Sequence, residues 1–256
     1  MARQAPNFFC ILPKEMSNAE RTKLAMRVYH EAHCNIFDGT SFDEFYASVF
    51  SPATEFTKLM ILTYGGQITG YVSFHVYKVP VIEKDIYVVM TEMGTNKCVK
   101  HPFEFLSQEI LKYSLQNFDK ELYLIDTAIT PYIYQKCCNK FNEIYPKYGT
   151  KTPDKLLTLL DQVGKHFHWQ VNNHNDALVR SLQWKIKTDY EIQHYQNCVD
   201  DTDINYYKNL VPNYQTGQGL VVAVPLSITN SIKTATKVLY TAMQREKEAI
   251  NYLRAW

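Results

Sequence analysis

The feature that most constrains the fold of this chain is a pair of β-rich runs joined by two glycines. The runs cover Phe56–Tyr64 and Gln67–Val79, and Gly65-Gly66 lies between them. Adjacent glycines adopt positive φ without steric cost, which a two-residue hairpin turn requires. The sequence therefore predicts an antiparallel β-hairpin in its first third, and a sheet to which this hairpin belongs.

Helix and strand signals surround the hairpin. Helix starts are predicted at four places: Ser17 to Glu20, Ser41 to Glu44, Pro102, and Thr130-Pro131. The first two have the capping-box spacing, in which serine and glutamate satisfy each other's free amides, and they predict helices over 18–33 and 41–50. Proline is common in the first turn of a helix, so Pro102 and Thr130-Pro131 predict the other two helix starts. Further strands are predicted over Phe8–Leu12, Ile86–Met90, Leu122–Ile129 and Gly219–Val224.

The second part of the chain has more predicted helix. Helices are expected over 152–166, 176–184 and 231–255, and a strand over 190–199. No linker rich in proline or glycine separates the two parts. We predict one α/β unit in which residues 1–148 form the core, while 149–256 supply a helical insertion, the late strands and a C-terminal helix.

The charge balance argues against a nucleic-acid binder. The chain has 27 basic and 26 acidic residues, and neither sign forms a long run. No stretch reaches the roughly 18 apolar residues that a membrane span needs. We therefore predict no nucleic-acid partner and no membrane span.

The N-terminal region and the cysteines indicate a cytoplasmic protein. The apolar stretch Phe8–Leu12 is too short for the core of a signal peptide, although export by a dedicated secretion system would leave the same pattern. Six scattered cysteines without a C-x-x-C pair favour reduced thiols over disulfides or zinc, and we predict no metal. A composition rich in lysine, asparagine and tyrosine indicates an AT-rich microbial genome, so a bacterial source is expected.

Three segments together resemble the GNAT superfamily of N-acetyltransferases. Gln67–Val72 is similar to the hairpin return of that family, in which a glycine follows a tight turn. Asp85–Glu92 is similar to the central strand before its cofactor loop, and Thr130–Phe141 to its strand-to-helix junction. The resemblance covers about residues 7–145, and 190–199 and 219–224 are the candidates for the family's last two strands.

The resemblance implies a mixed α/β fold, a mostly antiparallel sheet with a central parallel pair and flanking helices. It implies transfer of an acetyl or longer acyl group from acetyl-CoA or another acyl-CoA to an amine on a small molecule or a protein. Two parallel strands, 86–92 and 122–129, would separate to hold the pantetheine arm, and the helix from Pro102 would meet the pyrophosphate. The cofactor-binding residues so implied are Met90, Thr91, Lys97, Lys100, His101 and Phe103.

The predicted cofactor loop departs from the family pattern. GNAT loops usually contain glycines that let the backbone approach phosphate, whereas this loop has no glycine after Gly94. Lys97, Lys100 and His101 would supply charge instead of a close backbone approach. An ordinary solvated loop with surface lysines is the alternative.

The catalytic residues implied by the resemblance are Glu92, Asp85 and Tyr134. Glu92 and Asp85 are two candidates for the general base, and ordinary strand-end carboxylates are the alternative for both. The position at which the family often has a tyrosine acid falls on Cys137, and Tyr134 or Tyr132 would then replace it. A buried structural cysteine is the alternative for Cys137.

Two other functions remain open at this stage. One is a GNAT-like module that has lost catalysis and binds a protein or small-molecule partner, which the missing glycines favour. The other is an unrelated α/β interaction protein, for which we would expect a sheet without a separated parallel pair.

Overall fold

The computed structural model describes residues 7–81, 84–95, 101–174, 177–187, 201–234 and 236. Its strands are β1 (Asn7–Ile11), β2 (Phe37–Asp38), β3 (Phe56–Tyr64), β4 (Gln67–Val81), β5 (Lys84–Thr95), β6 (Leu122–Ala128), β7 (Gln170–His174), β8 (Ala177–Ser181), β9 (Lys185–Ile186) and β10 (Gln218–Pro225). Its α-helices are α1 (Asn18–Val28), α2 (Cys34–Ile36), α3 (Phe42–Phe45), α4 (His101–Gln116), α5 (Pro131–Lys140), α6 (Asp154–His166) and α8 (Thr202–Leu210). Two π-helical turns, Tyr29–His33 and Tyr46–Phe50, continue α1 and α3, and single 3₁₀ turns cover Pro13–Glu15 and Tyr214–Thr216.

Eight of the strands form one sheet in the order β1-β3-β4-β5-β6-β10-β8-β7. β5 and β6 pair in parallel, and every other described pairing within this sheet is antiparallel. The fold is therefore a mixed, mostly antiparallel sheet with a central parallel pair, as predicted. This order contradicts the alternative of a sheet that lacks such a pair.

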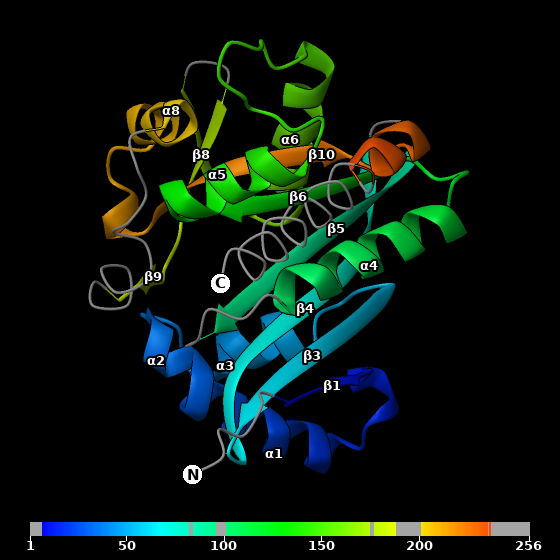
Figure 1. Cartoon of the computed structure of the whole chain (residues 1–256), viewed down its shortest axis with the longest axis vertical. Coiled ribbons are helices and arrows are strands. Elements are labelled where there is room, and N and C mark those ends of the chain that lie inside the picture. Colours follow the sequence, from blue (N-terminus) through cyan, green and yellow to red (C-terminus); the bar gives the residue numbers. More distant parts are fainter. Residues whose placement is uncertain are drawn as a thin grey trace, which may run out of the picture.

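Helices cover both faces of the sheet (Figure 1). On one face, α4, α5 and α8 pack on β3 to β6 and β10 through a cluster that includes Leu106, Tyr134 and Tyr207. On the other face, α1 and α3 cover β3 and β4, and α6 covers the region of β5, β6 and β10. Residues on one strand alternate between these two cores, because successive side chains point to opposite faces.

The local signals in the sequence form the predicted contacts. Ser17 and Ser41 each accept a hydrogen bond from the backbone of the glutamate three residues later, and each glutamate accepts one in return, so both capping boxes are present. Gly65 and Gly66 have φ angles of 59° and 81°, which suits the tight turn between β3 and β4. Thr130 accepts a hydrogen bond from the Ile133 backbone N–H and caps α5.

Three predictions in the second part of the chain have different outcomes. The helix predicted over 176–184 is wrong, because residues 177–181 form β8, which pairs with β7 and β10. Since β8 is the partner of β10, it occupies the place that we expected the segment 190–199 to take. That segment lies outside the described residues. Of the predicted helix 231–255, residues 231–234 and 236 are described, and they are helical.

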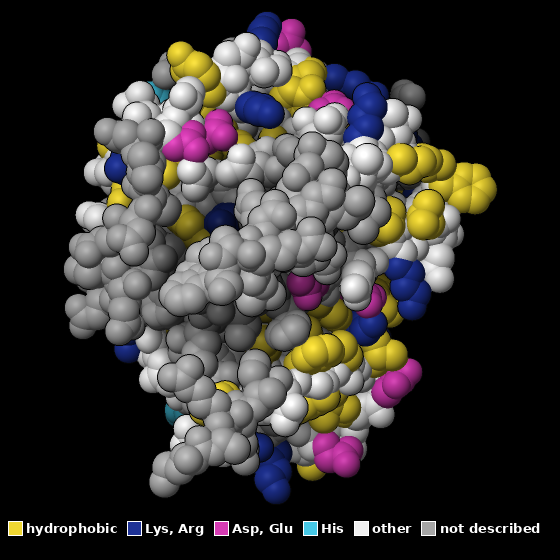
Figure 2. Space-filling view, viewed as in Figure 1, with side chains coloured by type: hydrophobic (Ala, Val, Ile, Leu, Met, Phe, Trp, Pro, Cys, Tyr) yellow, Lys and Arg dark blue, Asp and Glu magenta, His cyan; other side chains and the backbone are white. Residues whose placement is uncertain are grey.

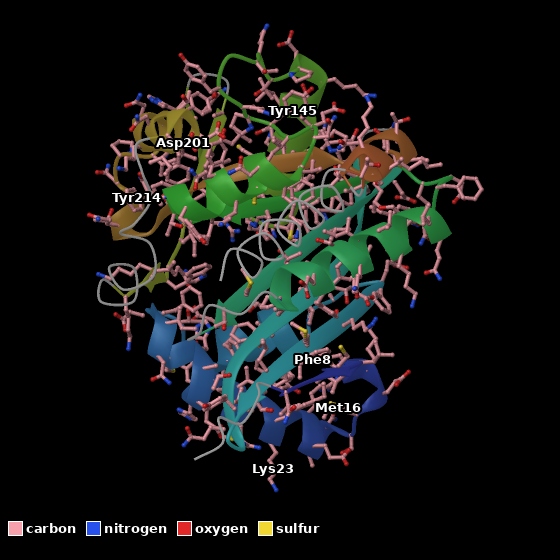
Figure 3. The ribbon with its side chains drawn as sticks, in the orientation of Figure 1. Phe8, Met16, Lys23, Tyr145, Asp201 and Tyr214 are labelled. Atoms are coloured by element: carbon pink, nitrogen blue, oxygen red, sulfur yellow. The ribbon has the colours of Figure 1, made fainter. Side chains whose placement is uncertain are left out.

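The chain after α5 returns to the sheet through Tyr145. Its backbone N–H donates to the Ala223 carbonyl at 2.9 Å, and the Ala223 N–H donates to the Tyr145 carbonyl at 2.7 Å. Figure 3 shows Tyr145 in the upper part of the molecule and Phe8, on the edge strand β1, in the lower part. The middle of the sheet, where β5 meets β6, lies between these two ends (Figure 1).

The described surface mixes both signs of charge. Figure 2 shows basic and acidic side chains interspersed on the face that it presents, with hydrophobic side chains gathered at the edge where α4 ends. Leu115 and Phe118, at and just after the end of α4, are among the most exposed large hydrophobic residues. Within the described part of the chain, no helix has both the length and the apolar character needed to cross a membrane.

Candidate active site

The two parallel strands separate part-way along their length. β5 and β6 pair through Tyr87, Val88 and Val89, and Val89 opposite Leu124 is the last pair. β5 continues to Thr95 and β6 to Ala128, so both strands extend past the end of their pairing. A cavity of about 490 Å³ lies here, and its described lining includes both strands.

Asp126 bridges part of this opening. Its Oδ2 accepts hydrogen bonds from the Thr91 backbone N–H, at 3.2 Å, and from the Thr91 hydroxyl, while its Oδ1 accepts one from the Thr127 N–H at 2.7 Å. Burial raises the pKa of Asp126 to about 6, although these hydrogen bonds and the charge of Arg180 oppose the rise. The Thr91 N–H, which lies just beyond the paired part of β5, therefore already donates to a side chain of β6.

Glu92 is the carboxylate best placed for proton transfer. It lines the cavity near the end of β5, and the Ser48 hydroxyl lies 3.5 Å from its Oε2. Burial and the nearby charge of Asp126 raise the pKa of Glu92 to about 7, while Arg180 opposes the rise. A carboxyl group with this pKa can accept and release a proton near neutral pH.

Arg180 of β8 brings a positive charge to the same cavity. Its guanidinium lies 4.4 Å from the centre of the Trp169 ring, and its Nη1 is 3.4 Å from the Thr127 hydroxyl. Burial lowers its pKa from the usual value. Trp169 and Arg180 both line the cavity, so the segment from α6 to β8 forms one of its walls.

The two π-helical turns contribute to the opposite wall. His33 closes the first turn and Ser48 lies within the second, and both line the cavity. The His33 Nδ1 is 2.8 Å from the Tyr71 hydroxyl, and burial lowers the pKa of His33 to about 4, so the imidazole is neutral at pH 7. Such turns are frequent at functional sites because they shift side chains away from the regular helical path.

Helix α5 lines the cavity from the side of α4. Ile133, Cys137 and Lys140, at helical spacing, all reach it. Burial raises the pKa of the Cys137 thiol to about 12 and lowers the pKa of Lys140 to about 8. At pH 7 the thiol is therefore protonated, and Lys140 can exchange a proton.

The structure separates the two candidate bases. Glu92 lies in the cavity, whereas Asp85 is half-exposed and forms an ion pair with Lys78 at 2.7 Å. The two carboxylates are seven residues apart on one strand, which corresponds to about 23 Å at 3.3 Å per residue. Asp85 is therefore not part of this site.

Tyr134 also lies away from the cavity. It is fully buried against α8, with its ring 5.7 Å from that of Tyr207, and its hydroxyl donates to the Pro146 carbonyl at 2.9 Å. Cys137, one helical turn later, reaches the cavity instead.

The predicted cofactor-binding residues divide into two groups. Met90 and Thr91 line the cavity. Lys97 and Lys100 lie outside the described residues, and of His101 and Phe103 only the helical backbone in the first turn of α4 is described.

Gly94 has a packing role. A Cβ placed there would lie 2.8 Å from the Tyr71 ring and 3.1 Å from the Phe37 ring, and both rings line the cavity. Glycine at this position therefore lets two aromatic rings approach the strand.

Sequence reasoning missed Asp126 and Arg180. Asp126 lies inside a predicted strand, where a polar residue indicates only the solvent face, and Arg180 lies in a segment that we predicted as a helix. Across the described ranges, no group of three or more His, Cys, Asp or Glu side chains is arranged to hold a metal ion.

No protein-family model matches this chain, and no curated protein matches its sequence. Solved structures do match it. A conserved protein of unknown function from Enterococcus faecalis V583, described as a probable N-acyltransferase, matches over 54% of this chain at 11% identity and a TM-score of 0.35. That match spans only 33% of the Enterococcus protein.

Two further matches span nearly the whole length of the other protein. The match to an acyl-CoA N-acyltransferase from Pseudomonas aeruginosa spans 68% of this chain and 95% of the Pseudomonas protein, at 11% identity and a TM-score of 0.32. The match to an N-acetyltransferase from Staphylococcus aureus Mu50 spans 88% of this chain and 100% of the Staphylococcus protein, at 7% identity and a TM-score of 0.33. All three identities lie below 25% and all three TM-scores below 0.5, so these matches carry no argument on the family, the substrate or the mechanism of this chain.

Proposed function

We propose that this protein is an N-acyltransferase that transfers an acetyl or longer acyl group from acyl-CoA to an amine. The observation that carries the proposal is the opening between β5 and β6 beyond Val89 and Leu124, with a cavity in it and Glu92 in its wall. Parallel strands that separate in this way leave unpaired backbone groups beside a space for an extended ligand.

The acyl donor fits part of this arrangement well. Acyl-CoA supplies an acyl group activated as a thioester, and Met90 and Thr91 on β5 are the residues that would lie beside it. The N-terminal turn of α4 is the part of the chain that would meet the phosphates, because the positive end of a helix dipole favours an anion. Thr91 N–H is less available, because Asp126 already accepts its hydrogen bond, so Asp126 has to turn aside if the donor uses that group.

Glu92 is the residue that we assign as general base. An ammonium group cannot attack a carbonyl carbon until it loses a proton, and a carboxylate with a pKa of about 7 accepts that proton near neutral pH. The nitrogen then forms the new C–N bond as the C–S bond breaks, and the electron pair of the C–S bond stays on sulfur.

Lys140 is the residue that we assign as proton donor to the departing sulfur. It lines the cavity from α5, and burial lowers its pKa to about 8, close to that of an ordinary thiol. The Cys137 thiol is a poorer donor, because its pKa of about 12 is higher than that of the group it would protonate.

A second candidate function is a binding module without catalysis. The hydrogen bonds from Thr91 to Asp126 favour it, because they occupy the opening with a group of the chain itself. Such a module would use the same cavity for a small molecule or a protein segment and would not need acyl-CoA.

Isothermal titration with acetyl-CoA and with longer acyl-CoAs separates the two candidates. We expect binding of at least one of them, and release of the free thiol when a suitable amine is added. Failure of every acyl-CoA to bind, even at high concentration, would remove the acyltransferase proposal and leave the binding module.

A further inference from the structure

Arg180 is a partly buried cation whose buried Nε has no hydrogen-bond partner among the described residues. Its Nη1 has one long contact to the Thr127 hydroxyl, at 3.4 Å. The ring of Trp169 supports one side of the guanidinium. An unsatisfied buried donor is costly, which indicates that a partner outside the described chain completes it.

The carboxylates near Arg180 already have other partners. Asp126 accepts three hydrogen bonds from Thr91 and Thr127, and Glu92 has the contact to Ser48. The charge of Arg180 opposes the rise in the pKa of both carboxylates, but the described residues contain no ion pair that joins Arg180 to either of them. The planar fork of a guanidinium matches the two oxygens of a carboxylate or a phosphate.

Arg180 and Glu92 lie on the same face of the sheet. Val179 packs in the core under α4, α5 and α8, so its neighbour Arg180 points to the opposite face. Glu92 directly precedes Met93 on β5, and since Met93 packs against that same core, Glu92 also points to the opposite face. Both groups therefore face the side of α6, whereas the proposed path of the acyl donor starts at α4 on the other side.

The lining as a whole is balanced in charge. Its described part contains three acidic and three basic side chains: Glu44, Glu92, Asp126, Lys136, Lys140 and Arg180. A volume of about 490 Å³ is typical of a small-molecule site, and the acceptor has to share it with the reactive end of the acyl donor. A small acceptor that carries both a positive and a negative group leaves this balance unchanged.

We propose that the acceptor is a small zwitterion, whose amine lies at Glu92 and whose carboxylate or phosphate is bound by Arg180. This inference rests on the proposed acyltransferase function and specifies its substrate class. Arg180 acts here as a specificity-determining residue that binds the anionic group, while the amine is the group that receives the acyl chain.

Matched pairs of compounds test the inference. In each pair the first compound, called the acidic member, carries a carboxylate or phosphate, and the second lacks that negative charge. The pairs are L-phenylalanine, L-methionine and L-serine, each with its amide, and O-phosphoethanolamine with ethanolamine. Binding of each compound to the protein alone is measured by isothermal titration, and acylation by thiol release with acetyl-CoA. We expect at least one acidic member to bind about tenfold or more tightly than its partner, as loss of a charged hydrogen-bond pair predicts.

Variants of Arg180 show which side chain makes the distinction. Arg180→Gln should remove the preference and raise KM with little change in kcat, because it removes binding that is equal in ground and transition states. Arg180→Lys should retain part of the preference, since it keeps the charge without the fork. Arg27→Gln, which changes an exposed arginine paired with Glu31, is the matched control and should leave the preference intact.

The possible outcomes separate this inference from the proposed function. Acylation of amides and plain amines as efficient as that of the acidic members would overturn the zwitterion and leave the acyltransferase. Failure to bind acyl-CoA would remove the acyltransferase, while Arg180-dependent binding of an acidic member would still support the anion site. Binding of none of the acidic members, or an unchanged preference in a folded Arg180→Gln variant, would overturn the inference.

Discussion

The two ends of strand β5 carry the same kind of side chain in opposite surroundings. At one end, Asp85 is half-exposed and paired with Lys78. At the other, Glu92 lines a cavity beside a second carboxylate, and its pKa rises to about 7. Position on the strand made both of them candidate bases, and their surroundings now distinguish them. Burial and neighbouring charge, rather than a place in the sequence, therefore decide which carboxylate can transfer a proton.

The largest effect that we expect concerns turnover. Glu92→Gln removes the proposed base and should lower kcat with acetyl-CoA and an amine acceptor by about 10²- to 10⁴-fold. Asp85→Asn is the matched control at the other end of the strand and should keep the wild-type rate within about twofold, because that residue touches no reacting group. Equal rates for both variants would remove Glu92 from the mechanism.

The second effect is on stability and depends on pH. The folded protein holds the Glu92 proton more tightly than the unfolded chain does, since its pKa rises from 4.5 to about 7. This carboxyl therefore favours the folded state most below its unfolded pKa, and the fold loses that contribution as pH rises towards 7.

The change in the free energy of unfolding that Glu92→Gln causes should thus be more favourable to the fold at about pH 8 than at about pH 4, by roughly 2–3 kcal/mol. Urea denaturation of wild type and variant at the two pH values measures the difference. The same double comparison with Asp85→Asn should give a much smaller change. A Glu92→Gln effect that is equal at both pH values would contradict the raised pKa.

A third effect tests the cause of the raised pKa. Asp126→Asn removes a negative charge near Glu92, so the pKa of Glu92 should fall towards its usual range. Carbon-13 NMR titration of the side-chain carboxyl groups reports this directly. Asp85→Asn should leave the Glu92 titration unchanged, and a Glu92 pKa that is the same in both variants would assign the shift to burial alone.

The smallest effect concerns the exposed end of the strand. Lys78 and Asp85 are both about half-exposed, and ion pairs of this kind contribute little because solvent screens them. Asp85→Asn should therefore leave the midpoint of urea denaturation almost unchanged. A clear fall in that midpoint would show that this end of β5 has a structural role that its exposure does not suggest.

Much of the fold could be predicted because its signals are local. The capping boxes at Ser17 and Ser41 and the glycine pair in the β3–β4 turn act within a few residues of themselves. β8 could not be predicted in this way. Its five residues are strand because they pair with β7 and β10, and that pairing depends on the whole sheet.

The site was predictable only where it follows the strands. Glu92, Met90 and Thr91 were identified because β5 was recognised, and they do line the cavity. Arg180 was missed because its strand was predicted as a helix. Asp126 was missed because nothing in the sequence marks the residue at which β6 stops pairing with β5.

The pH dependence of kcat is the most direct test of Glu92 as the general base. If Glu92 in the opening between β5 and β6 is the base, kcat should rise with pH through an apparent pKa of about 7, as this carboxyl loses its proton. The rising limb should disappear in Glu92→Gln and persist in Asp85→Asn. A wild-type kcat that is flat between about pH 6 and pH 8, or an unchanged rising limb in Glu92→Gln, would contradict the account.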